Sequence, residues 1–256
     1  FRTKLSENLF KGLSPWLSKL PGGLVHVNVV GCALFAAISG SSAATVATVG
    51  KMSIPELRKR KYPEKLLLGS LAGSGTLGLL IPPSIILIIY GVTIEDSIAK
   101  LFMAGILPGI MIALLFMLYV IFWSILNKKL MPKSIETFSF SEKVQGSKQL
   151  LPVILLITSV IGSIYTGIAT ATEAASLGVV GALILSFFQG TLNKNTFNLS
   201  LLGATKTSCM IAFILAGSTF LSLAMGFTGL PRNLAIWIDG MNLSPYTLLF
   251  VLTIFY

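Results

Sequence analysis

Acidic side chains, histidine and cysteine are all scarce in this sequence. Its 256 residues include 9 Asp and Glu, one histidine and two cysteines, and only 11% of the residues carry charge. An ordinary soluble domain has about 25% charged residues. So few charges cannot cover the surface of a soluble fold, which excludes a soluble enzyme, a disordered chain, a coiled coil and a DNA-binding domain.

The same scarcity limits the chemistry that the chain can perform. Cys32 and Cys209 lie in apolar runs, without metal-ligand spacing and without the pattern of a disulfide framework. The single histidine, His26, has no acid or cysteine at metal-ligand spacing, so a structural role is favoured. No two acids share an apolar run. We therefore expect no catalytic residues and no transition-metal site, which argues against an intramembrane enzyme.

Long apolar runs are what the sequence has in abundance. Hydrophobic residues make up 54% of the chain, and the mean hydropathy is +0.86. A helix needs about 20 mostly apolar residues to cross the roughly 30 Å hydrocarbon core of a bilayer. The sequence therefore predicts an all-α integral membrane protein. We expect transmembrane helices at 66–91, 101–126, 151–168, 173–188 and 207–227, an interfacial amphipathic helix at 1–20 and an amphipathic connector at 231–241.

The net charge of +10 is concentrated in the gaps between apolar runs. Residues 51–65 carry six Lys or Arg and two Glu, and residues 127–150 carry five Lys and two Glu. Residues 189–206 are also basic, whereas the intervening gaps are neutral or acidic. This alternation follows the positive-inside rule and places the basic gaps in the cytoplasm, so it does not indicate nucleic-acid binding.

Residues 24–50 form an apolar run that a Ser-Gly-Ser-Ser sequence at 39–42 interrupts. The arm before Ser39 has 15 residues, about 22 Å of helix, which is too short to span the membrane. Both flanks of the run are basic, so we expect a re-entrant helical hairpin that enters and leaves on the cytoplasmic side. Its tip, Ser39-Gly40-Ser41-Ser42, offers hydroxyl and backbone groups to an ion or a carboxylate; close packing of helices through small residues is the other interpretation.

The run 66–91 contains Pro82-Pro83, preceded by three glycines. Because proline has no N–H, Pro82 frees the carbonyl of Gly78 and Pro83 frees that of Leu79. We predict a discontinuous helix whose free carbonyls suit a dehydrated cation such as Na⁺. A plain proline kink is the alternative.

Several motifs, in this order and spacing, resemble the large membrane subunit of tripartite ATP-independent periplasmic (TRAP) transporters. They are Ile38-Ser39-Gly40-Ser41-Ser42-Ala43, Gly50-Lys51-Met52-Ser53-Ile54-Pro55, Gly75-Thr76-Leu77-Gly78-Leu79-Leu80-Ile81-Pro82-Pro83-Ser84, Ala104-Gly105-Ile106-Leu107-Pro108-Gly109 and Gly167-Ile168-Ala169-Thr170-Ala171-Thr172-Glu173-Ala174-Ala175.

The resemblance implies Na⁺-coupled secondary active uptake of an organic acid, such as a C4-dicarboxylate or sialic acid, in a bacterial inner membrane. It also implies an elevator motion, a small (Q-type) membrane subunit and an extracytoplasmic (P-type) binding protein. By the resemblance, the ion site comprises Ser39, Gly78, Ile81 and Pro82. We further expect the substrate near Gly40, Ser41, Ser42, Thr76, Pro83 and Ser84. No arginine lies within an apolar run, so hydroxyls, backbone N–H groups and Na⁺ would hold its carboxylate.

Relatives in this family have further segments on both sides of such a chain, so we expect a fragment that lacks N- and C-terminal parts. The amphipathic helices at 1–20 and 231–241 precede similar apolar runs, 24–50 and 244–256, on opposite predicted sides. This pattern indicates an inverted repeat whose second hairpin begins at 244.

Three alternatives remain. A binding-protein-independent divalent-anion/Na⁺ symporter of related architecture is the nearest one, and a channel or a scaffold subunit is more distant.

Glu173 is either a functional intramembrane acid or, in the pattern Thr170-x-x-Glu173, part of a capping box.

Overall fold

The computed structural model describes residues 5–132 and 138–255, and all regular secondary structure in these ranges is helical. Residues 1–4 of the predicted amphipathic helix, 133–137 of the basic gap and Tyr256 lie outside the described residues. The chain divides into two compact units, Phe1–Thr196 and Phe197–Tyr256, which are described separately.

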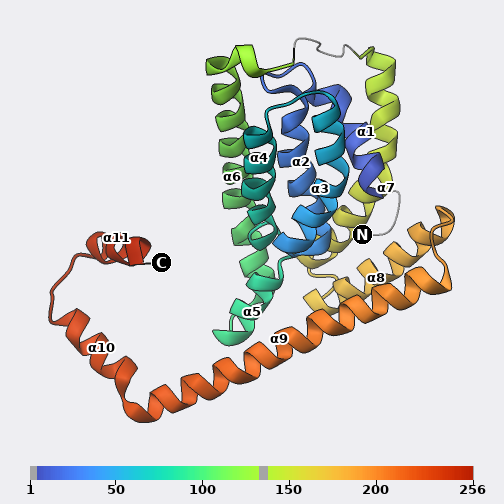
Figure 1. Ribbon diagram of the computed structural model, residues 1–256. Helices are drawn as coiled ribbons and strands as arrows, with labels where there is room; N and C mark the ends of the chain where they lie inside the picture. Colours follow the sequence, from blue (N-terminus) through green and yellow to red (C-terminus); the bar gives the residue numbers. More distant parts are fainter. Residues whose placement is uncertain (1–4, 133–137, 256) are drawn as a thin grey trace. The chain divides into compact units, whose positions relative to one another are not determined.

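The first unit is a helical bundle that ends in two apolar helices (Figure 1). Its elements, in order, are α1 (Leu5–Leu17), η1 (Gly23–Val25), α2 (His26–Ser39), α3 (Ser42–Lys59), α4 (Glu64–Gly75), η2 (Thr76–Leu79), α5 (Ile85–Thr93), α6 (Ile98–Leu126), η3 (Lys128–Leu130), α7 (Phe140–Tyr165) and α8 (Ala171–Phe188). The long helix α9 (Lys194–Thr228) begins just before the boundary, and α10 (Leu230–Asp239) and α11 (Pro245–Phe255) complete the second unit.

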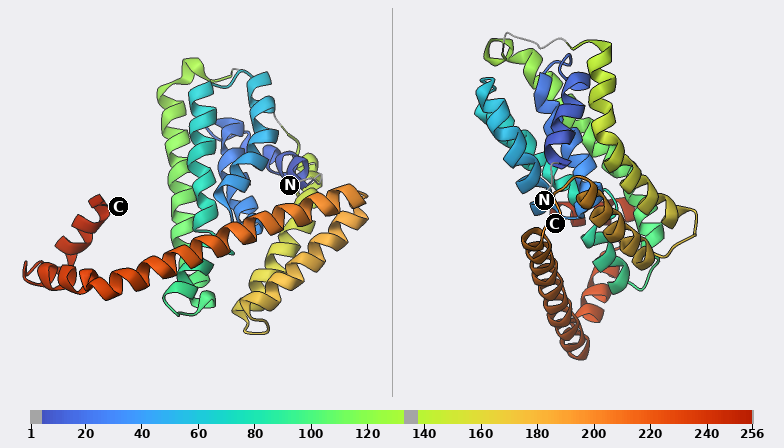
Figure 2. Two further views of the ribbon diagram at one scale, coloured as in Figure 1. Left: turned by 60° about the horizontal axis from the view of Figure 1, so that its bottom comes forward. Right: turned by 90° about the vertical axis from the view of Figure 1, so that its right-hand side faces the viewer.

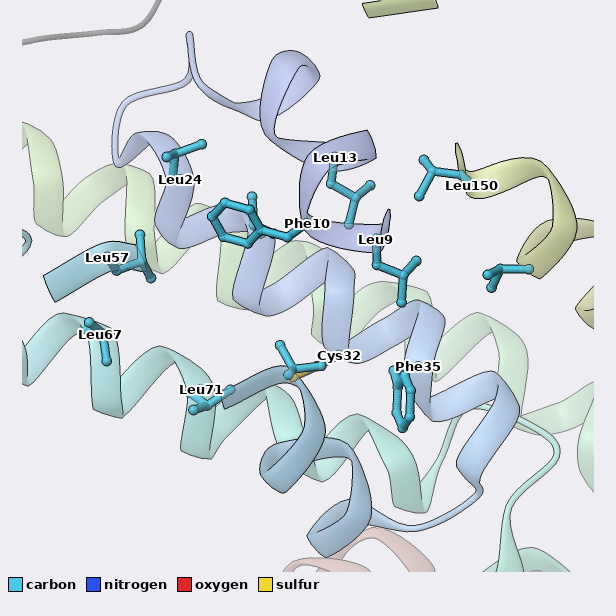
Figure 3. Close-up of a cluster of buried hydrophobic side chains, with 13 residues drawn as sticks. Leu9, Phe10, Leu13, Leu24, Cys32, Phe35, Leu57, Leu67, Leu71 and Leu150 are labelled. Carbon is cyan, nitrogen blue, oxygen red and sulfur yellow. The ribbon is translucent and has the colours of Figure 1, made fainter. Parts of the chain in front are cut away.

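Helix α2 lies at the centre of the bundle, in contact with α1, α3, α4 and α6. Nine of the 14 residues of α2 are buried, as expected for a helix whose apolar residues are spread around all its sides and which protein surrounds. Cys32 and Phe35 of α2 pack with Leu71 of α4 and Leu57 of α3 in the main hydrophobic cluster (Figure 3).

Helix α1 packs against α7, although more than 130 residues separate their contacting side chains. Leu13 of α1 and Leu150 of α7 are both buried in the main cluster (Figure 3), and the indole nitrogen of Trp16 donates to the Ser147 hydroxyl at 2.9 Å. Leu9, Phe10 and Leu13 on the apolar stripe of α1 are therefore covered by protein. The predicted position of α1 at the bilayer surface stays a prediction.

The outer helices expose apolar side chains to an extent that water would not tolerate. On α6, Leu107 is 77% exposed and Phe122 is 65% exposed. By length and composition, Ile98–Leu126, Ala171–Phe188 and Lys194–Thr228 could each cross a membrane, and the bent pair Phe140–Lys148 and Leu150–Tyr165 could add a fourth span. Such a surface is typical of a helical membrane protein, in which lipid or further membrane helices cover exposed apolar side chains.

Two helices extend into segments whose polarity predicts loops. Helix α3 continues to Lys59, where its basic last turn complements the helix dipole and Arg60 pairs with Glu56 one turn back at 2.8 Å. Helix α7 begins at Phe140, inside the basic gap 127–150, because Ser139 and Glu142 form a capping box. Helix α3, the second arm of the hairpin, therefore extends beyond residue 50, where the apolar run ends.

Candidate ion and substrate site

The tip of the α2–α3 hairpin is a tight turn that depends on glycine. Gly40 has φ 59° and ψ 11°, a left-handed conformation that favours glycine, and its N–H donates to the Ala36 carbonyl at 2.9 Å. Ser41 is extended and starts α3 by accepting a hydrogen bond from the Ala44 N–H at 3.4 Å. Two residues thus reverse the chain between the two helices.

A polar pair closes the inner side of this turn. The hydroxyl oxygens of Ser39 and Thr45 are 2.8 Å apart, and Thr45 is fully buried. The Ser39 hydroxyl also lies within donor distance, 3.3 Å, of the Ser41 carbonyl. Sequence reasoning missed Thr45. The pair spans six residues across the turn, so helical spacing does not predict it.

The helix that begins with α4 is interrupted around the two prolines. Helix α4 ends at Gly75 and continues as the short 3₁₀ turn η2, and α5 begins at Ile85 beyond Pro82-Pro83. Pro82 has no N–H to donate to the Gly78 carbonyl. The expectation of a free Leu79 carbonyl is wrong, because the hydroxyl of the buried Ser84 donates to it at 2.6 Å.

The hairpin tip and the helix break meet through backbone atoms. The Gly40 carbonyl accepts a hydrogen bond from the Ile85 N–H at 3.1 Å. A methyl group on Gly40 would lie 2.7 Å from the Pro83 carbonyl oxygen, and one on Gly78 would lie 2.9 Å from the Ser42 nitrogen. Both glycines are therefore needed for this close approach.

Helix α6 closes the break on another side through small residues. A methyl group on Gly105 would lie 2.6 Å from the Leu80 carbonyl oxygen, and one on Gly109 would lie 2.8 Å from a side-chain carbon of Ile81. Helices α4 and α6 run side by side in Figure 1 and in the left view of Figure 2. The glycines of the Ala-Gly-Ile-Leu-Pro-Gly motif therefore allow α6 to approach the irregular backbone.

The structure brings most of the predicted site residues together. Ser39, Gly40, Ser41 and Ser42 form the tip, and Gly78, Ile81, Pro82, Pro83 and Ser84 form the break that faces the tip and α6. Thr76 differs, since it is exposed and its hydroxyl donates to the Gly73 carbonyl at 2.7 Å. Binding of an ion or a substrate by these residues stays a prediction.

Two other candidate residues have structural roles. The Glu173 carboxylate accepts from the Thr170 N–H at 2.8 Å, and the Glu173 N–H donates to the Thr170 hydroxyl at 3.3 Å. This confirms the capping-box interpretation of Glu173. His26 is fully buried, with its Nε2 atom 2.8 Å from the Pro21 carbonyl oxygen. In residues 5–132 and 138–255, no three His, Cys, Asp or Glu side chains gather as a metal site.

Exposed apolar helices, and two interruptions of the helical backbone that contact each other in the first unit, are features of a helical integral membrane protein. The chain belongs to the family described as "Tripartite ATP-independent periplasmic transporter, DctM component", which it matches over residues 2–256. The large permeases of this family are multi-pass proteins of the inner membrane.

Curated relatives agree with this assignment. A C4-dicarboxylate TRAP transporter large permease of Pseudomonas aeruginosa is 35% identical over 91% of this chain and 54% of its own length. The isethionate permease protein DctMQ of Oleidesulfovibrio alaskensis is 32% identical over 98% of this chain and 39% of its own length. The sialic acid large permease SiaM of Vibrio cholerae is 31% identical over 98% of this chain and 58% of its own length.

The chain spans about half the length, or less, of these curated relatives. They are transporter permeases and not enzymes, which confirms the family and the transporter class expected from the motifs.

Proposed function

We propose that the protein to which this chain belongs performs Na⁺-coupled secondary active uptake of an organic acid, as the transport subunit of a tripartite system. The observation that carries the proposal is the contact between the hairpin tip and the helix break, in which the Gly40 carbonyl accepts from the Ile85 N–H. Two interrupted backbones that contact each other bring carbonyl and hydroxyl oxygens together within the bundle. In membrane carriers, such unwound segments are where Na⁺ and anionic substrates bind.

The proposed ion site uses the oxygens on the inner side of this contact. Gly78 contributes the carbonyl that Pro82 cannot pair, and Ser39 contributes a hydroxyl oriented by Thr45 at 2.8 Å. Ile81 and Pro82 supply the neighbouring carbonyls of the irregular segment. Hard cations prefer oxygen ligands, and these carbonyls and the hydroxyl are uncharged ligands of that kind.

The proposed substrate is an organic anion held near the remaining tip and break residues. The relatives named above transport, by their names, C4-dicarboxylates, isethionate or sialic acid. Gly40, Ser41 and Ser42 at the tip, with Thr76, Pro83 and Ser84 at the break, are the proposed contacts. With the Ser84 hydroxyl donating to Leu79, the Ser41 and Ser42 hydroxyls and backbone N–H groups are the donors best suited to the carboxylate.

The remaining parts of the proposal concern motion and partners. A small Q-type membrane subunit and an extracytoplasmic P-type binding protein would complete the system; the name DctMQ of one relative is consistent with a large and a small subunit in one chain. An inverted repeat would supply the other side of the site, and an elevator motion of the site-bearing part against a scaffold would give alternating access.

The test is uptake by the full-length permease, reconstituted with its small subunit in proteoliposomes. We expect accumulation of a radiolabelled organic acid only with an inward Na⁺ gradient and only with the binding protein outside. K⁺ in place of Na⁺ is the matched control. Accumulation without the binding protein would support the alternative, a binding-protein-independent symporter, and accumulation in K⁺ alone would refute Na⁺ coupling.

A further inference from the structure

A cavity of about 890 Å³ lies at the end of the bundle remote from the hairpin tip. Its walls come from the loop before η1, the turn between α3 and α4, and the C-terminal end of α6, which lie together at the top of Figure 1. The loop before η1 lies at the N-terminal end of α2, and the hairpin tip lies at its C-terminal end. The length of α2 therefore separates the cavity from the candidate ion site. The volume falls in the range of small-molecule sites, roughly 300–1,000 Å³.

The cavity is strongly basic. Five of its lining residues are basic, and one, Glu56, is acidic: the basic residues are Lys19, Lys59, Arg60, Lys61 and Lys128. The Glu56 carboxylate pairs with the Arg60 guanidinium at 2.8 Å. Among the residues that line the cavity, no second acid is present to pair with the four lysines. The charge comes from three segments, 1–20, 51–65 and 127–150, all of which the positive-inside rule places in the cytoplasm.

Two buried hydroxyls in the cavity wall lack hydrogen-bond partners. Ser18 is 5% exposed and Ser124 is 4% exposed, and neither hydroxyl has a partner among the described residues. A buried hydroxyl without a partner is unfavourable, so native structures normally satisfy it. An anion with several acceptor oxygens would accept hydrogen bonds from both hydroxyls while the lysines neutralise its charge.

The cavity also has an apolar side that reaches the exposed surface of α6. Ile125 lines the cavity and is 47% exposed, and its neighbours Phe122 and Leu126 are 65% and 67% exposed. Leu20 and Met131 add further apolar lining. A free inorganic anion would gain nothing from this side, whereas a lipid could place its acyl chains along α6.

We propose that this cavity binds the headgroup of an anionic phospholipid, with its phosphate among Lys59, Lys61, Lys128 and the Ser18 and Ser124 hydroxyls. Basic pockets between membrane helices on the cytoplasmic side are suited to such headgroups. The proposal is independent of the ion and substrate site.

The test measures lipid binding to the full-length permease. Delipidated protein is titrated with phosphatidylglycerol or phosphatidylcholine, and bound copies are counted by native mass spectrometry. The variant K59Q/K61Q/K128Q removes three charges from the cavity. The control K51Q/K65Q/K129Q removes three charges from the same basic segments outside the cavity lining.

We expect selective binding of phosphatidylglycerol to the wild type. Since each basic residue contributes about a fivefold effect, the cavity variant should bind roughly 100-fold more weakly. The control should change several-fold at most. Ser124→Ala, which leaves every charge in place and suits a helix interior, should weaken binding about tenfold through the lost hydrogen bond to the phosphate.

Three results would overturn the proposal. Equal losses in the cavity and control variants would mean diffuse surface attraction. Equal binding of phosphatidylcholine and phosphatidylglycerol would show that binding does not depend on the negative charge of the lipid. Cavity-dependent binding of inorganic phosphate, with no phosphatidylglycerol bound, would assign the cavity to a free anion. Because Na⁺-driven uptake is measured separately, failure of either proposal leaves the other standing.

Discussion

Replacing Gly78 by alanine tests whether the hairpin tip must rest against the helix break. The added methyl would lie 2.9 Å from the Ser42 nitrogen, 3.0 Å from the Ser41 carbonyl carbon and 3.1 Å from the Ser41 carbonyl oxygen. All three are backbone atoms of the tip, so no side chain can rotate to relieve the contact. The tip or the break must shift instead.

Insertion of one methyl group into a tightly packed site costs typically about 1–3 kcal/mol. If Na⁺ binds only while the tip contacts the break, this cost reduces the binding free energy of Na⁺. We expect the Na⁺ concentration that gives half-maximal uptake to rise about 5- to 150-fold in Gly78→Ala. The assay is uptake by the full-length permease at increasing Na⁺, with constant ionic strength and matched protein levels.

Gly69 provides the matched control on the same helical segment. A methyl group there would have no atom outside its own helix turn within 4 Å, and alanine is the better helix former by about 1 kcal/mol. Gly69→Ala should leave the Na⁺ dependence within twofold of the wild type. An unchanged Na⁺ dependence in Gly78→Ala, at normal expression, would refute the requirement for close contact between tip and break.

Three further predictions follow from named contacts. Replacing Pro82 and Pro83 together by alanine should let the helix close over the freed carbonyl and raise the Na⁺ requirement more than it lowers expression; an unchanged Na⁺ titration would mean a simple kink. Thr45→Val should raise the Na⁺ requirement about tenfold because it removes the hydroxyl that contacts Ser39, whereas Thr45→Ser keeps that hydroxyl and should not. Equal Na⁺ titrations for the two variants would show that the Thr45 hydroxyl does not contribute to Na⁺ binding. A cysteine at Ser41, in a cysteine-free background, should react with an impermeant thiol reagent from the cytoplasm in at least one ion condition; labelling only from outside would contradict the re-entrant topology.

The interruptions of the two helices could be predicted because their causes are local. A left-handed residue between two short apolar arms favours a glycine such as Gly40, and proline removes a helical donor wherever it stands. The capping box at Glu173 is also a local pattern, readable at a spacing of three residues.

What surrounds these local features could not be predicted in the same way. The apolar stripe of α1 has the same periodicity whether lipid or protein covers it, so only the fold shows that Leu13 meets Leu150. The hydrogen bond from the Ser84 hydroxyl to Leu79 depends on a rotamer that the sequence does not specify. Charge predicted loops at 51–65 and 127–150, yet α3 and α7 extend into them, because a polar segment at the end of a bundle can remain helical.

The contact between tip and break also explains how irregular backbone is stabilised within the helical bundle. Non-helical backbone at membrane depth is tolerated only where protein or a water-filled cavity covers it. Here the Gly40 carbonyl satisfies the N–H of Ile85, which is one of the four N–H groups that α5 cannot pair internally. Withdrawal of the tip would leave that N–H without its partner, at a cost of about 1–3 kcal/mol unless water or a bound ligand replaced it. The hairpin is therefore part of the hydrogen bonding of the break, and any motion that separates the tip from the break loses this bond.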